Sequence, residues 1–195
     1  MQRATVSPHS PRIPLGPAKG RLASAWLARR WYYTPRTRRA YSVRQVSPGD
    51  RRLLAEFALA LRRESTERDA HSLRELTAML FDRVIVTGSD VSVGFAALEN
   101  TAAGDRVIGV CAYAPENEHS ATFTIAVANA FREEQVGRTL LATLLRHAKR
   151  VGVPRLTGEM LWSNRPMQML ALSSGFVIEP VPRDRNLRRL VLALK

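Results

Sequence analysis

The chain has 195 residues, 45% of them hydrophobic, and carries 30 Lys and Arg against 17 Asp and Glu, a formal net charge of +13. This length and apolar content suit one domain with its own core plus an extension. No apolar run reaches the roughly 18 residues of a membrane-spanning helix, so we expect no membrane span. The single cysteine, Cys111, excludes an internal disulfide framework and a cysteine-based zinc site. We expect it to be a core residue, with a catalytic thiol as the alternative.

The positive charge is concentrated at the start of the chain. Residues 1–49 contain ten Lys and Arg and no Asp or Glu, which leaves 20 against 17, or +3, for residues 50–195. We expect residues 1–40 to be a basic flexible leader in front of a domain at 41–195. Its alternatives are an arm that binds nucleic acid or an anionic membrane and a mitochondrial presequence. The expected location is cytoplasmic, or the mitochondrial matrix if the leader is a presequence.

The first half of the domain predicts strands around two helices. Residues 41–46 alternate in polarity and predict the first strand, and Pro48 in the following turn suits the start of a helix. Helices are predicted at residues 51–63 and 72–81, where apolar residues recur on one face. Strands are predicted at residues 84–86, 91–98 and 106–114.

The second half alternates strands with helices. In the strand predicted at residues 123–128, Phe123, Ile125 and Val127 share one face. A helix is predicted at residues 136–150, with Leu140, Leu141, Leu144, Leu145 and Ala148 as its buried stripe. A strand at 155–161, a helix at 163–174 capped by Ser163, and strands at 176–179 and 188–194 follow. This order predicts a mixed α/β sheet in a single domain.

The turn between the strand at 123–128 and the helix at 136–150 is a candidate anion site. A helix N-terminus exposes backbone N–H groups and the positive end of the helix dipole. Gly137 permits a ligand to approach the backbone closely, and Arg132 and Arg138 flank the turn. The alternative is an ordinary strand–helix connection, which Glu133 and Glu134 favour because acids there already satisfy the dipole.

The same turn resembles the acetyl-CoA-binding motif of the GNAT acetyltransferase superfamily, Gln/Arg-x-x-Gly-x-Gly/Ala at a helix start. Arg132 and Gly137 match the motif, while Gln135 replaces its middle glycine. The segment from Arg155 to Phe176, with GEMLWSNRPM, is similar to the acetyltransferase domain of bacterial protein lysine acetyltransferases. The resemblance covers roughly residues 41–194. It implies a mixed, mostly antiparallel central sheet flanked by helices.

The resemblance also implies a function: transfer of an acetyl group from acetyl-CoA to an amine, either a protein lysine or a small amine, by direct attack. The backbones of Ile125 and Val127 would pair with the cofactor arm, and Asn164 would contact that arm from the later helix. An alternative for Asn164 is local satisfaction of the backbone in the first helical turn. The pyrophosphate would be held by the backbone of Arg132, Gln135, Val136, Gly137, Arg138 and Thr139. No metal is implied.

The catalytic residues are not evident. The glutamate that serves as base in the resembled lysine acetyltransferases falls at Thr122, and the tyrosine acid of many GNAT enzymes falls at Ala171. Glu116, Glu118 and His119, just before the central strand, remain as candidates, each with a solvated loop residue as its alternative. The alternative function is therefore a catalytically degenerate acyl-CoA-binding regulatory module. A nucleic-acid partner is expected only through the basic leader.

Overall fold

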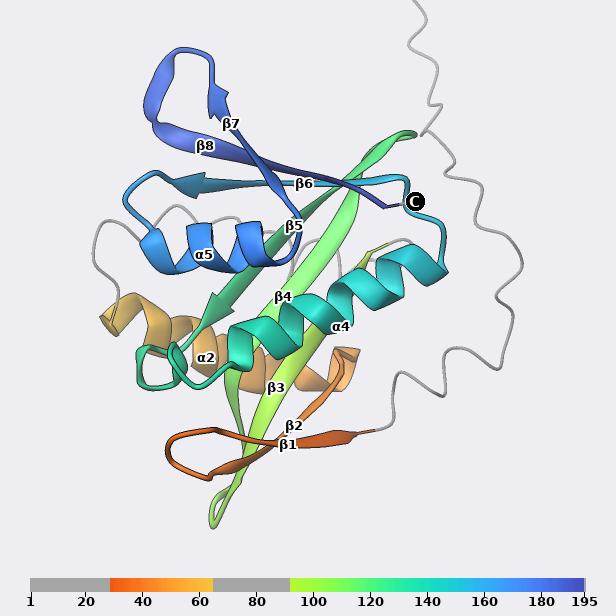
Figure 1. Ribbon diagram of the computed structural model, residues 1–195. Coiled ribbons are helices and arrows are strands. Elements are labelled where there is room, and N and C mark those ends of the chain that lie inside the picture. Colours follow the sequence, from red (N-terminus) through yellow and green to blue (C-terminus); the bar gives the residue numbers. More distant parts are fainter. Residues whose placement is uncertain (1–28, 65–91, 195) are drawn as a thin grey trace, which may run out of the picture.

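The computed structural model describes residues 29–64 and 92–194, which form one sheet with helices on both faces (Figure 1). The strands are β1 (Arg30–Tyr33), β2 (Ala40–Gln45), β3 (Val93–Thr101), β4 (Gly104–Asn117), β5 (Ser120–Val127), β6 (Arg155–Leu161), β7 (Val177–Val181) and β8 (Asp184–Ala193). The α-helices are α2 (Arg51–Glu64), α4 (Val136–Arg150) and α5 (Arg165–Ser173). Short 3-10 turns lie at Pro48–Asp50 and Asn129–Phe131.

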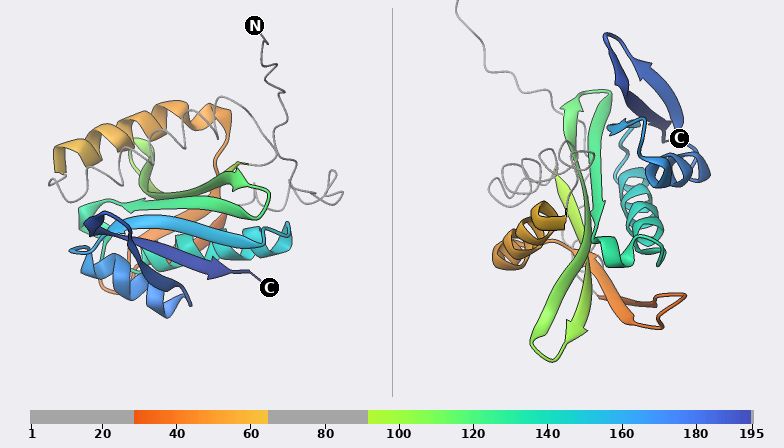
Figure 2. Two further views of the ribbon diagram at one scale, coloured as in Figure 1. Left: turned by 90° about the horizontal axis from the view of Figure 1, so that it is seen from above. Right: turned by 90° about the vertical axis from the view of Figure 1, so that its left-hand side faces the viewer.

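The strands follow the order β1-β2-β3-β4-β5-β6-β8-β7 across the eight-stranded sheet. Neighbouring strands are antiparallel except for β5 and β6, which are parallel because helix α4 carries the chain back across one face. Figure 2 shows α4 and α5 on one face of the sheet and α2 on the other. The expected mostly antiparallel mixed sheet is confirmed.

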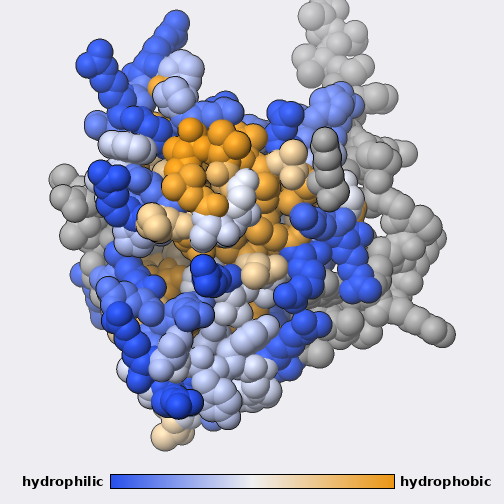
Figure 3. All heavy atoms as spheres, in the orientation of Figure 1, coloured by the Kyte–Doolittle hydropathy of each residue, from blue (hydrophilic) through white to orange (hydrophobic). Residues whose placement is uncertain are grey.

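Two apolar clusters, one on each face, hold the layers together. The larger packs α4 and α5 against the sheet, and its centre is the predicted stripe of α4, in which Leu140, Leu141, Leu144 and Ala148 are fully buried. The smaller packs Leu54, Phe57 and Leu61 of α2 onto the opposite face. Figure 3 shows apolar side chains over α5 and the adjoining strands, where Met169, Leu172 and Val177 are more than half exposed.

The sheet begins at Arg30, ahead of the domain start expected at residue 41. Strand β1 pairs with β2 in an antiparallel hairpin, and Tyr32 stacks on Tyr41 with ring centroids 5.5 Å apart. Arginines of the expected leader also form ion pairs with the rest of the fold: Arg29 with Asp105, Arg36 with Glu133 and Arg39 with Glu99. Part of the positive charge of the expected leader is therefore neutralised by acids of the folded domain. Residues 1–28 lie outside the described residues.

The other predicted elements that the structure describes agree within four residues at each end, and the cap of α5 differs. Helix α4 and strand β6 begin and end at the predicted residues. Helix α5 is capped by Asn164 instead of Ser163, since the Asn164 Oδ1 accepts a hydrogen bond of 3.2 Å from the Met167 N–H. The helix predicted at 72–81 and the strand at 84–86 lie outside the described residues. No helix in the described ranges has both the length and the apolar character needed to span a membrane.

Candidate functional site

Strands β5 and β6 run side by side only where they begin. Their parallel pairing comprises Ala121 with Leu156 and Thr122 with Thr157. Beyond Thr122, β5 remains paired with β4 up to Val127, and β6 remains paired with β8 up to Leu161. The sheet therefore opens as a wedge along one edge of β5. Gly158 stands at the apex, where an added Cβ would lie 2.7 Å from the Phe123 ring, so only glycine permits this close packing.

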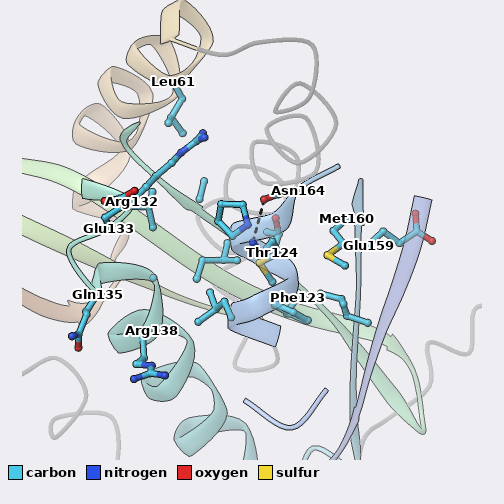
Figure 4. Close-up of a pocket in the computed structure, with 18 residues that line it drawn as sticks. Leu61, Phe123, Thr124, Arg132, Glu133, Gln135, Arg138, Glu159, Met160 and Asn164 are labelled. Atoms are coloured by element: carbon cyan, nitrogen blue, oxygen red, sulfur yellow. Dashed lines mark hydrogen bonds between the residues drawn. The ribbon is translucent and has the colours of Figure 1, made fainter. Parts of the chain in front are cut away.

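A cavity of about 300 Å³ occupies this wedge, and α4 and α5 begin beside it (Figure 4). Seven of the nine residues predicted to hold the cofactor line it: Ile125, Val127, Arg132, Gln135, Gly137, Arg138 and Asn164. The fold thus brings together residues from β5, the turn before α4, and the start of α5.

Val136 and Thr139 do not line the cavity. Val136, the first residue of α4, is fully buried in the core between this helix and the sheet. The N–H of Thr139 donates to the Gln135 carbonyl at 3.0 Å, and its Oγ1 lies 2.9 Å from the Tyr41 hydroxyl oxygen. Both polar groups of Thr139 are therefore engaged within the protein.

The turn before α4 is shaped by a left-handed residue. Gln135, the N-cap of α4, has φ 60°, and its side chain forms no capping hydrogen bond. An added Cβ at Gly137 would lie 3.5 Å from Leu170 and 3.6 Å from Val127, which is ordinary contact. The first turn of α4 contains no acidic residue. The helix N-terminus therefore faces the cavity without a side-chain cap.

The two acids before this turn are held by the β1–β2 hairpin. Glu134 is buried, and its Oε2 accepts a hydrogen bond of 3.0 Å from the Arg36 backbone N–H. The guanidinium of Arg36 pairs with Glu133. Their partners lie in the hairpin, so these acids do not occupy the N-terminus of α4, as the ordinary-connection alternative assumed.

Comparison with known proteins decides the family. A sequence profile of the acetyltransferase (GNAT) family matches residues 55–176, more than half of the chain. The chain belongs to the GNAT acetyltransferase family. Among curated protein sequences, none is significantly similar to it.

Solved structures of GNAT proteins have the same fold. A GNAT-family acetyltransferase from Streptococcus pneumoniae is 18% identical with a TM-score of 0.61, over 78% of this chain and 99% of that one. The GNAT domain of S. lividans PAT is 20% identical with a TM-score of 0.63, over 88% and 98%. The ribosomal-protein-S5-alanine acetyltransferase from Vibrio fischeri is 14% identical with a TM-score of 0.61, over 80% and 93%.

None of the predicted catalytic candidates lines the cavity. Glu116 accepts hydrogen bonds from Ser120 Oγ at 3.2 Å and Thr157 Oγ1 at 3.1 Å, which tie the β4–β5 hairpin to β6. Glu118 and His119 form an exposed pair at 3.3 Å in that hairpin. All three lie at the closed end of the wedge, before the last β5–β6 pair.

The two positions where GNAT enzymes often carry an acid or a base hold neither. Thr122 closes the wedge opposite Thr157, and Ala171 is fully buried in the core. The sequence reasoning missed a carboxylate that does line the cavity, Glu159 on β6. It is the one acid in the strand predicted at residues 155–161, and this is the only signal that the sequence offered, since the strand's place beside β5 comes from the fold.

The remaining nucleophilic and titratable groups of the core serve packing. Cys111 is fully buried, its Sγ donates to the Leu140 carbonyl at 3.4 Å, and burial raises its pKa, which agrees with a structural role. Tyr113 Oη lies 3.0 Å from His147 Nδ1. In the described ranges, no group of three or more His, Cys, Asp or Glu could hold a metal ion.

Proposed function

We propose that this GNAT protein is an N-acetyltransferase that transfers an acetyl group from acetyl-CoA to an amine, either a protein lysine or a small amine. The observation that carries the proposal is the wedge between β5 and β6, which leads to the uncapped N-terminus of α4. A long, narrow ligand with phosphates at one end suits this shape. The open edge of β5 offers backbone hydrogen bonds, and the helix end favours negative charge.

Different residues of the cavity would bind different parts of acetyl-CoA. Backbone N–H groups around Gln135 and Gly137 would hold the pyrophosphate, and Arg132 and Arg138 lie beside it as cations. Ile125 and Val127 would pair with the pantetheine arm through their backbones. Bound acetyl-CoA supplies an activated thioester. The fold would orient this thioester toward an amine that attacks its carbonyl carbon.

Calorimetric titration of acetyl-CoA into the full chain tests the site. We expect saturable one-to-one binding, a change of only a few-fold in Kd for Gly137→Ala, and loss of binding for Gly137→Asp. The alanine Cβ has room, whereas a carboxylate would repel the pyrophosphate. Normal binding by folded Gly137→Asp would show that the assignment is wrong.

The second candidate function is an acyl-CoA-binding regulatory module without turnover. It is favoured by Thr122 and Ala171, neither of which can act as an acid or base at neutral pH. A thiol reagent that detects released CoA separates the two functions. Release in the presence of spermidine, tyramine or Nα-acetyl-lysine amide indicates the enzyme, while acetyl-CoA binding without release from any of them indicates the module.

A further inference from the structure

Glu159 lies where β5 and β6 have just parted. The last parallel pair is Thr122 with Thr157, so Thr124 on β5 and Glu159 on β6 each stand two residues beyond it, on opposite sides of the gap. Both line the cavity, and Figure 4 shows Glu159 on the β6 side, with its carboxylate turned away from Thr124 toward the neighbouring strand, where Arg189 of β8 lies. The turn with Gln135 and Gly137 lies at the open end of the same wedge. A ligand whose phosphates rest on that turn would extend its other end toward Thr124 and Glu159.

Strand alternation places these two side chains on the α2 face of the sheet. Met160 belongs to the core under α4 and α5, so its neighbour Glu159 points to the opposite face. Ala126 packs with the α2 cluster, which sets Thr124 on that face too. Leu61 of α2 also lines the cavity. An amine that enters from the α2 face would therefore meet Glu159 at the apex of the wedge.

The carboxylate of Glu159 is held but remains accessible. Its side chain is 29% exposed, and its Oε1 lies 3.5 Å from Arg189 Nη2 on β8. In the strand register, Arg189 stands between Glu159 on β6 and Glu179 on β7. Arg189 thus orients Glu159 from the side away from the gap and leaves the carboxylate able to bind a cation there.

We propose that Glu159 is the general base of the acetyl transfer, an inference that rests on the proposed function. The Glu159 carboxylate takes a proton from the ammonium form of the acceptor, directly or through one water. The neutral nitrogen then forms a C–N bond with the thioester carbonyl carbon. The C–S bond breaks as the intermediate collapses, the nitrogen's remaining surplus proton passes to the thiolate to give the free thiol, and Glu159 returns its proton to solvent. The base thus stands on the strand beside the one that carries Thr122.

The test measures CoA release by the full chain with spermidine, tyramine and Nα-acetyl-lysine amide. For Glu159→Gln, we expect kcat to fall on the order of 100-fold, the typical contribution of a general base, while the Kd for acetyl-CoA changes less than about twofold. Glu179→Gln is the matched control. It removes an exposed carboxylate that stands opposite the same Arg189 in the strand register but outside the cavity, and its kcat should stay within about twofold of the unaltered chain.

A second variant makes the outcome independent of packing at this position. In Glu159→Ala, added formate should restore part of the activity, because a small carboxylate can occupy the space of the missing one; formate would not repair a structural defect. Equal kcat for Glu159→Gln and the unaltered chain would overturn the inference alone. So would equal losses in Glu159→Gln and Glu179→Gln, or no recovery with formate. Failure of the unaltered chain to release CoA with any of the three amines would overturn the proposed function and this inference together.

Discussion

Gln135 adopts a backbone conformation that glycine adopts at less cost. Its φ of 60° is left-handed, which costs a non-glycine residue roughly 1 kcal/mol or more. The family motif has glycine at this position, and the structure gives the physical reason. The fold accommodates Gln135 in this conformation. Replacing the glycine of the motif therefore raises the conformational free energy of the turn without changing its backbone shape.

Replacing Gln135 tests this cost. We expect Gln135→Gly to raise the free energy of unfolding by up to about 1 kcal/mol and to keep or improve acetyl-CoA affinity. Gln135→Val should lower both the free energy of unfolding and the affinity for acetyl-CoA, since a β-branched residue fits the left-handed region worst. Urea denaturation and calorimetric titration measure the two effects. A valine variant as stable as the unaltered chain would contradict the argument.

His147 makes the stability of the fold depend on pH. Burial and the nearby charge of Arg150 lower its pKa from 6.5 to about 4. The unfolded chain therefore binds an extra proton between these values, and the free energy of unfolding falls as the pH drops through that window. The stabilisation is fully present above pH 6.5. The loss by pH 4 is at most about 3 kcal/mol.

The substitution His147→Gln isolates this contribution. Glutamine retains polar atoms near the Tyr113 hydroxyl but does not titrate, so we expect a shallower decline in stability from pH 6.5 to 4. Urea unfolding at several pH values gives the change of the free energy of unfolding with pH for the unaltered chain and for the variant. The contributions of acidic groups present in both chains cancel when one slope is subtracted from the other. Identical slopes would mean that His147 is as easily protonated in the fold as outside it.

At the scale of elements, the β1–β2 hairpin binds two carboxylates that lie far along the chain, through a hydrogen bond and an ion pair. Glu134 accepts the Arg36 backbone N–H, and the buried Glu99 lies between Arg39 and Arg106, at 2.5 Å from the latter. The guanidinium of Arg39 also stacks over the ring of Phe131, 4.6 Å from its centroid. The hairpin therefore braces the turn that leads to α4 and its cavity.

Truncation measures what the hairpin contributes. A chain that begins at residue 29 keeps every contact described, and we expect it to match the full chain in stability. A chain that begins at residue 41 leaves Glu134 and Glu99 without their hairpin partners, which should cost on the order of 3 kcal/mol or more and weaken acetyl-CoA binding. Thermal unfolding and calorimetric titration compare the two. Equal stability would show that the hairpin does not brace the fold.

At the scale of the whole molecule, the cavity lies between two halves of one sheet whose adjoining strands, β5 and β6, are paired at only two positions. A ligand in the wedge would join β5 to β6 and stabilise the folded state by mass action. With acetyl-CoA at 100 times its Kd, we expect the free energy of unfolding to rise by about 2.7 kcal/mol. Urea denaturation with and without acetyl-CoA measures this rise, and Gly137→Asp, which should not bind, is the control that should show no rise.

Much of the fold could be predicted because its signals are local. Helix α4 lies within one amphipathic run that ends before Gly152, and strand β6 alternates along its full length. The candidate anion-binding turn also followed from neighbours in sequence. Seven of the nine residues proposed to hold the cofactor, from this turn, β5 and Asn164, line one cavity. The exact cap of α5 was missed, because Ser163 and Asn164 are both good N-caps and only the backbone path selects between them.

The sequence alone therefore determined the family and, from residue 40 onward, the order of the described strands and helices, since both depend on periodicity and on short motifs; it did not predict β1. Only the tertiary structure decided the rest. Arginines read as leader charge pair with acids about 70 to 100 residues away, and Glu159, an unremarked strand residue, faces the cavity. Alternation tells which face a side chain takes, but it does not tell which strand lies beside it or where two strands part. Those depend on long-range packing, such as the fit of Phe123 against Gly158, which is where the wedge begins.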